Sequence, residues 1–319
     1  MKAYRMVFCV CALLLGACRG DVPLTLASAE STLPAQTNAP LLPTTPPKPT
    51  TTPTLRSATQ APTATGVLAS PTPPLEAMIM DEEMIRITIL YDNNGFGEGL
   101  QSDWGFSALI EHQGHSLLFD TGANGAILQM NMETLGVDPE SIETVVLSHA
   151  HQDHTGGLDD LLRNGLQARI FLLPSFDQAF KDHISQRVEV IEVAPGEEVA
   201  PGFRSTGGLG ISPPEQALMV VTTQGPILIT GCAHPGIMTI VRKVVELTGE
   251  APRLVLGGFH LRGASRERVA QFIDELKELG VQQVAPCHCT GDQAIAAFAS
   301  AFEGNFISVG VGCILDLTP

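Results

Sequence analysis

"LSHAHQDHTGGL", from Leu147 to Leu158, contains three histidines and an aspartate within six residues. These side chains are His149, His151, Asp153 and His154, in the form H-x-H-x-D-H, although the whole chain has only nine histidines. The preceding run "IETVVLS" is rich in β-branched residues and predicts a buried strand that ends where the histidines begin. Imidazole nitrogens and carboxylate oxygens bind zinc, and they suit iron or manganese equally. The stretch therefore predicts a metal site at a strand end.

The four side chains can serve two metal ions. A loop that leaves the strand can aim His149 and His151 at one metal ion, while Asp153 and His154 point towards a second. The alternative is a polar loop whose histidines share no role. Four potential ligands in six residues, directly after a buried strand, favour the metal site.

Three further histidines follow other predicted strands. His234 lies in "ILITGCAHPGI", His260 in "LVLGGFHL" and His288 in "VAPCHCTG". Each of them alone could be an ordinary polar residue. In α/β arrangements, however, ligands collect at one set of strand ends. We therefore expect these histidines to converge on the H-x-H-x-D-H stretch.

The chain after position 80 alternates short strands with helices. Two hairpins are expected, one over Phe106–Phe119 and one over 217–231 with a turn at Gln224–Gly225. Helical spacing is found at Gly125–Leu135, Gly157–Leu166, Ile237–Leu247, Ser265–Leu279 and Gln293–Phe302, and "FISVGVGCILDL" predicts paired C-terminal strands. Two β-rich halves that each end in βα units predict an α/β (α+β) fold, with two mixed β-sheets packed face to face and helices outside.

Residues 1–18 have the layout of a secretory signal, with Lys2 and Arg5 before an apolar run that is too short for an ordinary spanning helix. The end of this segment, "LLGAC", resembles a bacterial lipobox, in which Cys18 becomes the lipidated first residue. A plain signal cut near Ala17 and an uncleaved anchor are the alternatives. Acyl chains on Cys18 predict an exported lipoprotein, anchored to membrane lipid on an extracytoplasmic face.

Residues 19–80 are rich in proline and threonine, which predicts a disordered, semi-rigid linker before a domain at 81–319. Thirteen of the 18 basic residues and 31 of the 34 acidic ones belong to that domain, which gives it a formal charge of −18. A nucleic-acid partner needs a basic surface, so none is expected. The domain's four cysteines are too scattered for a disulfide scaffold.

With "LLFDTG" upstream, "LSHAHQDHTGGL" resembles the metallo-β-lactamase superfamily, whose fold is an αββα sandwich with a two-metal site. "TGCAHPGI", "GGFHL" and "CHCTG" together resemble the branch that includes the archaeal 7,8-dihydropterin-6-methyl-4-(β-D-ribofuranosyl)aminobenzene 5′-phosphate synthase. The resemblance covers roughly Met84 to Pro319. It implies fold and metal site, and its motifs do not define a substrate.

The resemblance implies two sets of ligands. The first group is His149, His151 and His234, and the second group is Asp153, His154 and His288. Asp120 in "LFDTG" matches an aspartate that steadies a ligand histidine from behind. A cap or turn role before Thr121–Gly122 is the alternative for Asp120.

Two further residues have open roles. Many superfamily members bridge the metals with an aspartate, whereas "ITGC" offers Cys232 at a comparable place. Cys232 is a thiolate ligand or a buried small hydrophobe, and we favour the hydrophobe. His260 is a ligand or a substrate-facing acid, and we favour the acid. Asp153 and His260 are the candidates for proton transfer.

Two divalent ions, zinc first and iron or manganese as alternatives, lower the pKa of a bridging water and polarise a scissile bond. We therefore expect a hydrolase of an ester, lactone, phosphodiester or similar bond in a small-molecule substrate. The synthase reaction is the alternative, although its substrates are cytosolic and an exported protein would not meet them.

Two other function classes fit the sequence less well. Flavodiiron redox proteins share this fold, but their pattern has a glutamate at the position of His151. A non-catalytic metal-binding surface module is disfavoured by the intact ligand set. Arg262, Arg266 and Arg268 could meet an anionic substrate group, but we favour a solvated helix start for them.

Overall fold

The computed structural model describes residues Met84 to Pro319. The predicted signal at 1–18, the lipidation site Cys18 and the predicted linker at 19–80 lie outside the described residues. Within the described part, no helix combines the length and apolar character needed to cross a bilayer.

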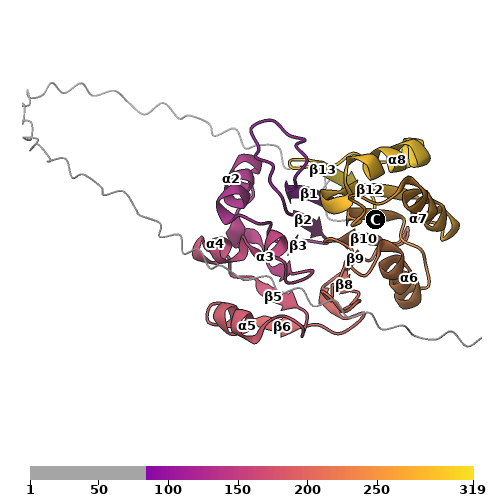
Figure 1. Ribbon diagram of the computed structural model, residues 1–319. Helices are drawn as coiled ribbons and strands as arrows, with labels where there is room; N and C mark the ends of the chain where they lie inside the picture. The colour runs from indigo at the N-terminus through magenta and orange to yellow at the C-terminus, as the bar shows by residue number, and fades with distance from the viewer. Residues whose placement is uncertain (1–83) are drawn as a thin grey trace, which may run out of the picture. The chain divides into compact units, whose positions relative to one another are not determined.

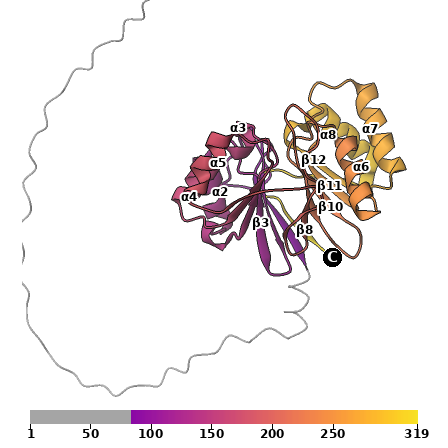
Figure 2. The ribbon, with the colours of Figure 1, turned by 90° about the horizontal axis from the view of Figure 1, so that it is seen from below.

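Two β-sheets form the centre of the domain (Figures 1 and 2). The first sheet has the order β13 (Ile314–Leu317), β1 (Ile85–Tyr91), β2 (Ser107–His112), β3 (His115–Phe119), β4 (Thr144–Val146), β5 (Arg169–Leu172) and β6 (Val190–Glu192). The second has the order β12 (Gln283–Cys287), β11 (Leu254–Gly258), β10 (Ile227–Thr230), β9 (Leu218–Val220), β8 (Phe203–Ser205) and β7 (Glu198–Ala200).

Helices cover the outer face of each sheet, as Figure 2 shows. The first sheet is accompanied by α2 (Gly125–Leu135), α3 (Gln152–Thr155), α4 (Leu158–Arg163) and α5 (Gln178–Ser185). The second is accompanied by α6 (Ile237–Thr248), α7 (Arg266–Glu278) and α8 (Asp292–Phe302). Short 3₁₀ turns occur at η1 (Pro139–Ser141), η2 (His288–Thr290) and η3 (Glu303–Asn305). The expected αββα arrangement of two mixed sheets flanked by helices is confirmed.

Both faces of the second sheet are buried, and the residues of β10 show how. Ile227 and Ile229 of β10 belong to the core shared with the first sheet, whereas Leu228 between them packs with the helices on the other side. Successive side chains of a strand point to opposite faces, so an unbroken apolar run such as "ILI" fits a sheet that is covered twice. The sequence signal for this strand was therefore a continuous run rather than an alternation.

Parallel pairing brings the carboxyl ends of several strands together. β3, β4 and β5 are parallel neighbours in the first sheet, and β10, β11 and β12 are parallel neighbours in the second. The segments that leave these ends carry the histidines: His149 follows β4, His234 follows β10, and His288 opens η2 directly after β12. Parallel strands thus create the edge at which chemistry-bearing loops meet.

Three local expectations differ from the structure. Asp153 and His154 lie in the short helix α3 rather than in a loop. Helix α5 was not predicted, although Phe176, Phe180 and Ile184 recur at helical spacing. The prediction that "FISVGVGCILDL" forms two paired strands was wrong. β13 pairs with β1 instead, and the segment before β13 makes only isolated bridges because glycines interrupt it.

Gly257 tests the contact between β10 and β11. Its φ is +118°, and a Cβ there would lie 2.1 Å from the carbonyl oxygen of Thr230. We predict that Gly257→Ala lowers the free energy of unfolding by about 3 kcal/mol, because strain and overlap combine. Urea unfolding of the two proteins measures this difference. Gly304→Ala is the control, because a Cβ at Gly304 meets nothing within 4 Å. Equal stability of both variants would contradict the packing described here.

Candidate metal centre

The first group of ligands, His149, His151 and His234, comes together at the strand ends. The three ring centroids are 4.7 to 4.8 Å apart, and His149 Nε2 lies 3.1 Å from His151 Nδ1. The Nε2 atom of His234 is shut off from solvent and has no hydrogen-bond partner among the described residues. A buried polar nitrogen without a partner is costly, and a bound cation removes that cost. These residues fit a metal ion.

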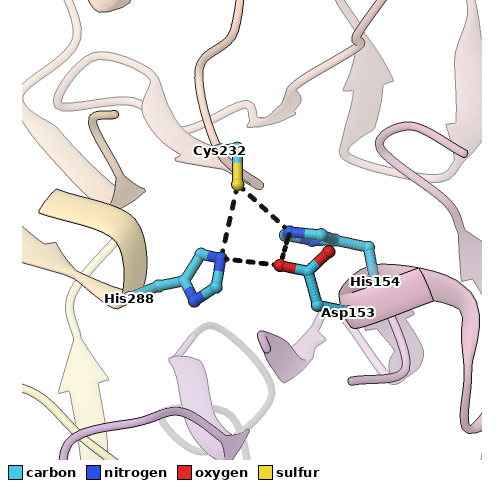
Figure 3. A group of neighbouring side chains, drawn as sticks. All are labelled: Asp153, His154, Cys232 and His288. Atoms are coloured by element: carbon cyan, nitrogen blue, oxygen red, sulfur yellow. Dashed lines mark hydrogen bonds and ion pairs between the residues drawn. The ribbon is translucent and has the colours of Figure 1, made fainter. Parts of the chain in front are cut away.

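The second group lies beside the first and includes a sulfur atom (Figure 3). Cys232 Sγ is 3.2 Å from His154 Nε2 and 3.3 Å from His288 Nε2. Asp153 Oδ2 lies 3.6 Å and 3.5 Å from the same two nitrogens. Two imidazoles, a carboxylate and a thiol facing one point are a donor set that zinc accepts with tetrahedral geometry.

Cys232 also contributes to the first group. Its sulfur and the ring nitrogens of His149 and His234 lie within 4.8 Å of one another. The sulfur therefore stands between the two groups, among nitrogen atoms rather than in an apolar contact. Cys232 is buried, as a small hydrophobe would be, and its polar neighbours also suit a thiolate ligand, so the choice between these two roles stays a prediction.

Asp120 supports a histidine of each group through hydrogen bonds. Its Oδ2 accepts hydrogen bonds from His154 Nδ1 and Ser148 Oγ, both at 2.7 Å, and its Oδ1 accepts one from Ser148 N at 2.7 Å. Ser148 Oγ lies 2.9 Å from His149 Nδ1, which can donate to it. When the Nδ1 atoms of His149 and His154 donate, their Nε2 atoms are left with free lone pairs. Asp120 thus fixes one histidine directly and one through Ser148.

Glu215 is a supporting residue that the sequence did not reveal. Its carboxylate is buried and accepts hydrogen bonds from the backbone N–H groups of Cys232, Ala233 and His234, at 2.9, 2.8 and 2.7 Å. Burial raises the pKa of Glu215 to about 7. Glu215 therefore shapes the turn after β10, which presents Cys232 and His234. No local pattern marks it, because its partners are backbone groups of another segment.

Asp92 and Asn93 support His288 in a similar way. Asp92 Oδ2 accepts a hydrogen bond from His288 N at 3.1 Å, and Asn93 Oδ1 lies 3.0 Å from His288 Nδ1. Both residues immediately follow β1. A signal was present, because polar residues at a strand end are the feature that identified the histidines.

Electrostatics favour neutral imidazoles at His149 and His234. Burial lowers the pKa of His149, and burial together with His260 lowers the pKa of His234 to about 4. In the second group burial opposes charge, but the neighbouring Asp120 raises the pKa of His154 to about 9. Burial alone would raise the pKa of Asp153. The hydrogen bond with His288 and the nearby His154 outweigh burial, so the pKa of Asp153 is lowered overall. A cation binding the second group displaces a proton from His154.

His260 lies at the rim and belongs to neither group. Its ring centroid is 4.5 Å from that of His234, and its side chain is exposed. A hydrogen bond with Cys289 raises the pKa of His260. Its donor atom and the sulfur atoms of Cys232 and Cys289 lie within 4.8 Å of one another, so these three residues are a further group of possible ligands. The substrate-facing role of His260 stays a prediction that this position permits.

The fold and the donor groups together define a metal-dependent enzyme architecture. Residues 105–242 match the family described as "Metallo-beta-lactamase superfamily". This match confirms the resemblance to the metallo-β-lactamase superfamily that the motifs indicated.

Known proteins resemble most of the described domain. The chain is 28% identical, over 278 residues, to the 7,8-dihydropterin-6-methyl-4-(beta-D-ribofuranosyl)-aminobenzene-5'-phosphate synthase of Methanocaldococcus jannaschii, covering 72% of this chain and 95% of that one. The crystal structure of Tm1679, described as a metal-dependent hydrolase of the β-lactamase superfamily, is 28% identical with a TM-score of 0.64 and covers 74% of this chain and 100% of its own. YhfI of Bacillus subtilis, at 16% identity, a TM-score of 0.58 and coverage of 73% and 99%, shares the fold.

The role of Asp120 leads to a prediction about metal affinity. In Asp120→Asn, either orientation of the amide places its NH₂ against a donor, Ser148 N or His154 Nδ1. We expect zinc affinity, measured by competition with a chromogenic chelator, to fall by about 10- to 100-fold. Asp177→Asn is the control, because Asp177 caps the exposed start of α5 and asparagine caps equally well. Unchanged affinity in Asp120→Asn would rule out this role.

The position of Cys232 leads to a spectroscopic prediction. Cobalt(II) bound by a thiolate has a charge-transfer band in the near ultraviolet, since sulfur is a soft and easily oxidised donor. We expect this band in the cobalt-loaded protein and its loss in Cys232→Ser. Cys313→Ser should keep the band, because Cys313 belongs to none of the donor groups. A band that persists in Cys232→Ser would show that the sulfur of Cys232 is not a ligand.

Proposed function

We propose that this domain is a metal-dependent hydrolase that cleaves an ester, lactone, phosphodiester or similar bond in a small molecule. The proposal is carried by one observation: the two donor groups share Cys232, beside a buried His234 Nε2 that has no hydrogen-bond partner within Met84–Pro319. The first group, completed by Cys232, holds one divalent ion. The second group, also with Cys232, holds the other.

Zinc is the preferred metal of the proposal. Nitrogen and sulfur donors in a compact cluster suit zinc, whereas manganese prefers oxygen-rich sites. Iron is the alternative metal. When bound, such ions make water acidic enough to attack near neutral pH and polarise the carbonyl or phosphoryl oxygen of the substrate. Cys232 takes the place that a bridging aspartate has in many members of the superfamily.

The chain's own residues supply orientation and proton transfer. Asp120 and Glu215 hold the ligand side chains and the turn after β10, so that the donor atoms need little rearrangement. Asp153 is partly exposed, with 20% of its side chain accessible, and accepts a proton from the attacking water. His260, whose pKa is raised by its contact with Cys289, donates a proton to the leaving group.

A transferase reaction like that of the archaeal synthase is the second candidate. That relative and the Tm1679 hydrolase are each 28% identical to this chain, so identity does not choose between the two reactions. The predicted export signal favours hydrolysis, because we expect the synthase's substrates to be cytosolic and an exported protein would not meet them. We propose that Cys18 is lipidated and anchors the domain to membrane lipid, and that no nucleic acid is bound.

A double variant tests the hydrolase and its first metal together. We predict that His149→Ala with His151→Ala removes one equivalent of zinc and reduces turnover to background. Elemental analysis of the purified full chain gives the zinc content, and a panel of 4-nitrophenyl esters, lactones and bis(4-nitrophenyl) phosphate gives the activity. His115→Ala with His183→Ala is the control, because these histidines pair with Glu143 and Asp159 away from the site. Full activity in the first double variant would refute the assignment.

The wild-type protein supplies the test against the other classes. A zinc-loaded chain that leaves every panel substrate intact would contradict the hydrolase and favour a binding or transfer role.

A further inference from the structure

A cavity of about 610 Å³ opens beside the metal centre and shares His288 with it. Its other walls include Asn93, which supports His288, and three residues to which the proposed chemistry gives no role: Trp104, Arg262 and Gln293. Because His288 belongs to the second group, a molecule bound in the cavity lies beside that group. The cavity is therefore placed to hold the part of the substrate beyond the reacting bond.

Trp104 offers an aromatic wall to this cavity. It is 39% exposed, and its ring centroid lies 5.0 Å from that of His288. Large exposed aromatic side chains are uncommon in the described domain, and this one stands next to a ligand histidine. An indole ring in such a position can stack on a planar group of a bound molecule.

Arg262 provides a positive charge at the same wall. Its guanidinium carbon lies 5.0 Å from the centroid of the Trp104 ring, and the residue is exposed. The ion pairs of the described residues involve five other arginines, and none involves Arg262. The guanidinium thus keeps its donors available for an incoming anion.

The backbone around Arg262 is held firmly. Arg262 N donates a hydrogen bond to the carbonyl oxygen of Cys289 at 3.2 Å. At Gly291, where φ is +82°, a Cβ would lie 3.0 Å from Arg262 Cα, so only glycine allows this close approach. The sequence expectation of a solvated helix start suits Arg266 and Arg268 of α7 but not Arg262, which precedes the helix and lines the cavity.

The charge balance around the cavity makes Arg262 distinctive. The domain carries a formal charge of −18, and Asp292 also lines the cavity, at the first turn of α8. Asp292 does not pair with Arg262. An anionic group entering here would therefore be repelled by most of the surface and attracted mainly by the metal ions and by Arg262.

We propose that this cavity is a substrate subsite for a planar ring that carries an anionic group. The ring stacks on Trp104, and the anion, a phosphate or a carboxylate, pairs with Arg262 while the reacting bond lies at the metal centre. This subsite would define the substrate class of the proposed hydrolase, and its role in the reaction rests on the proposed function.

The single tryptophan of the chain makes the subsite directly observable. Trp104 is the only tryptophan in the sequence, so the intrinsic fluorescence of the protein reports on this cavity. The zinc-loaded full chain is titrated with phenyl phosphate, with phenylacetate and with benzyl alcohol. We expect saturable fluorescence changes with the two anions, and at least tenfold weaker binding of the neutral alcohol.

Variants assign the effect to the guanidinium. Arg262→Gln should weaken the binding of phenyl phosphate by about tenfold or more, because a charge-assisted bidentate contact is lost. Arg266→Gln is the matched control and should bind as the wild type does. Circular dichroism and zinc content verify that each variant is folded and loaded.

Each outcome bears on the subsite separately from the hydrolase. Equal affinity in Arg262→Gln and the wild type would overturn the proposal, since the anion would then be held by the metal ions alone. Equal affinity for benzyl alcohol would overturn the anionic group. Because the readout is equilibrium binding, a chain without hydrolytic turnover can still confirm the subsite, and an active chain can still refute it.

Discussion

The centre of this domain depends on one buried carboxylate. Asp120 receives hydrogen bonds from His154, from the backbone of Ser148 and from its hydroxyl, and that hydroxyl also contacts His149. A single group thereby orients a histidine of each donor group and leaves both Nε2 atoms free for metal. A buried carboxylate is tolerated here because all of its hydrogen-bond acceptors have partners. Asp120 directly follows strand β3, and the histidines follow the parallel neighbouring strand β4, so the two strand ends bring them together.

Much of the fold and the histidine cluster could be predicted from local patterns. Local sequence was enough to predict the strand before His149, from its β-branched residues, and the hairpin over Phe106–Phe119. It was also enough to predict the helices that follow strands in each half of the domain. The support from Glu215 could not be predicted, because it binds backbone N–H groups of the turn after β10. Helix α5 was missed although its spacing was regular, and the C-terminal strand pairing depended on β1, more than two hundred residues earlier.

Cys232 illustrates why residue type alone is ambiguous. A cysteine at a strand end packs as a hydrophobe or binds metal, and the choice depends on neighbours from elsewhere in the chain. His154 and His288, which lie 78 and 56 residues away in sequence, both approach its sulfur. The same dependence holds for Arg262, whose place beside Trp104 becomes visible only once the loops after β1 and β11 are folded together.

We propose that six side chains from three segments, with Cys232 between them, enclose two metal ions. Anomalous diffraction at the zinc absorption edge, from crystals of the zinc-loaded chain, tests it most directly. We expect two peaks, one among His149, His151 and His234 and the other among Asp153, His154 and His288, each next to Cys232. Strong zinc peaks elsewhere, with neither donor group in contact with an ion, would contradict it.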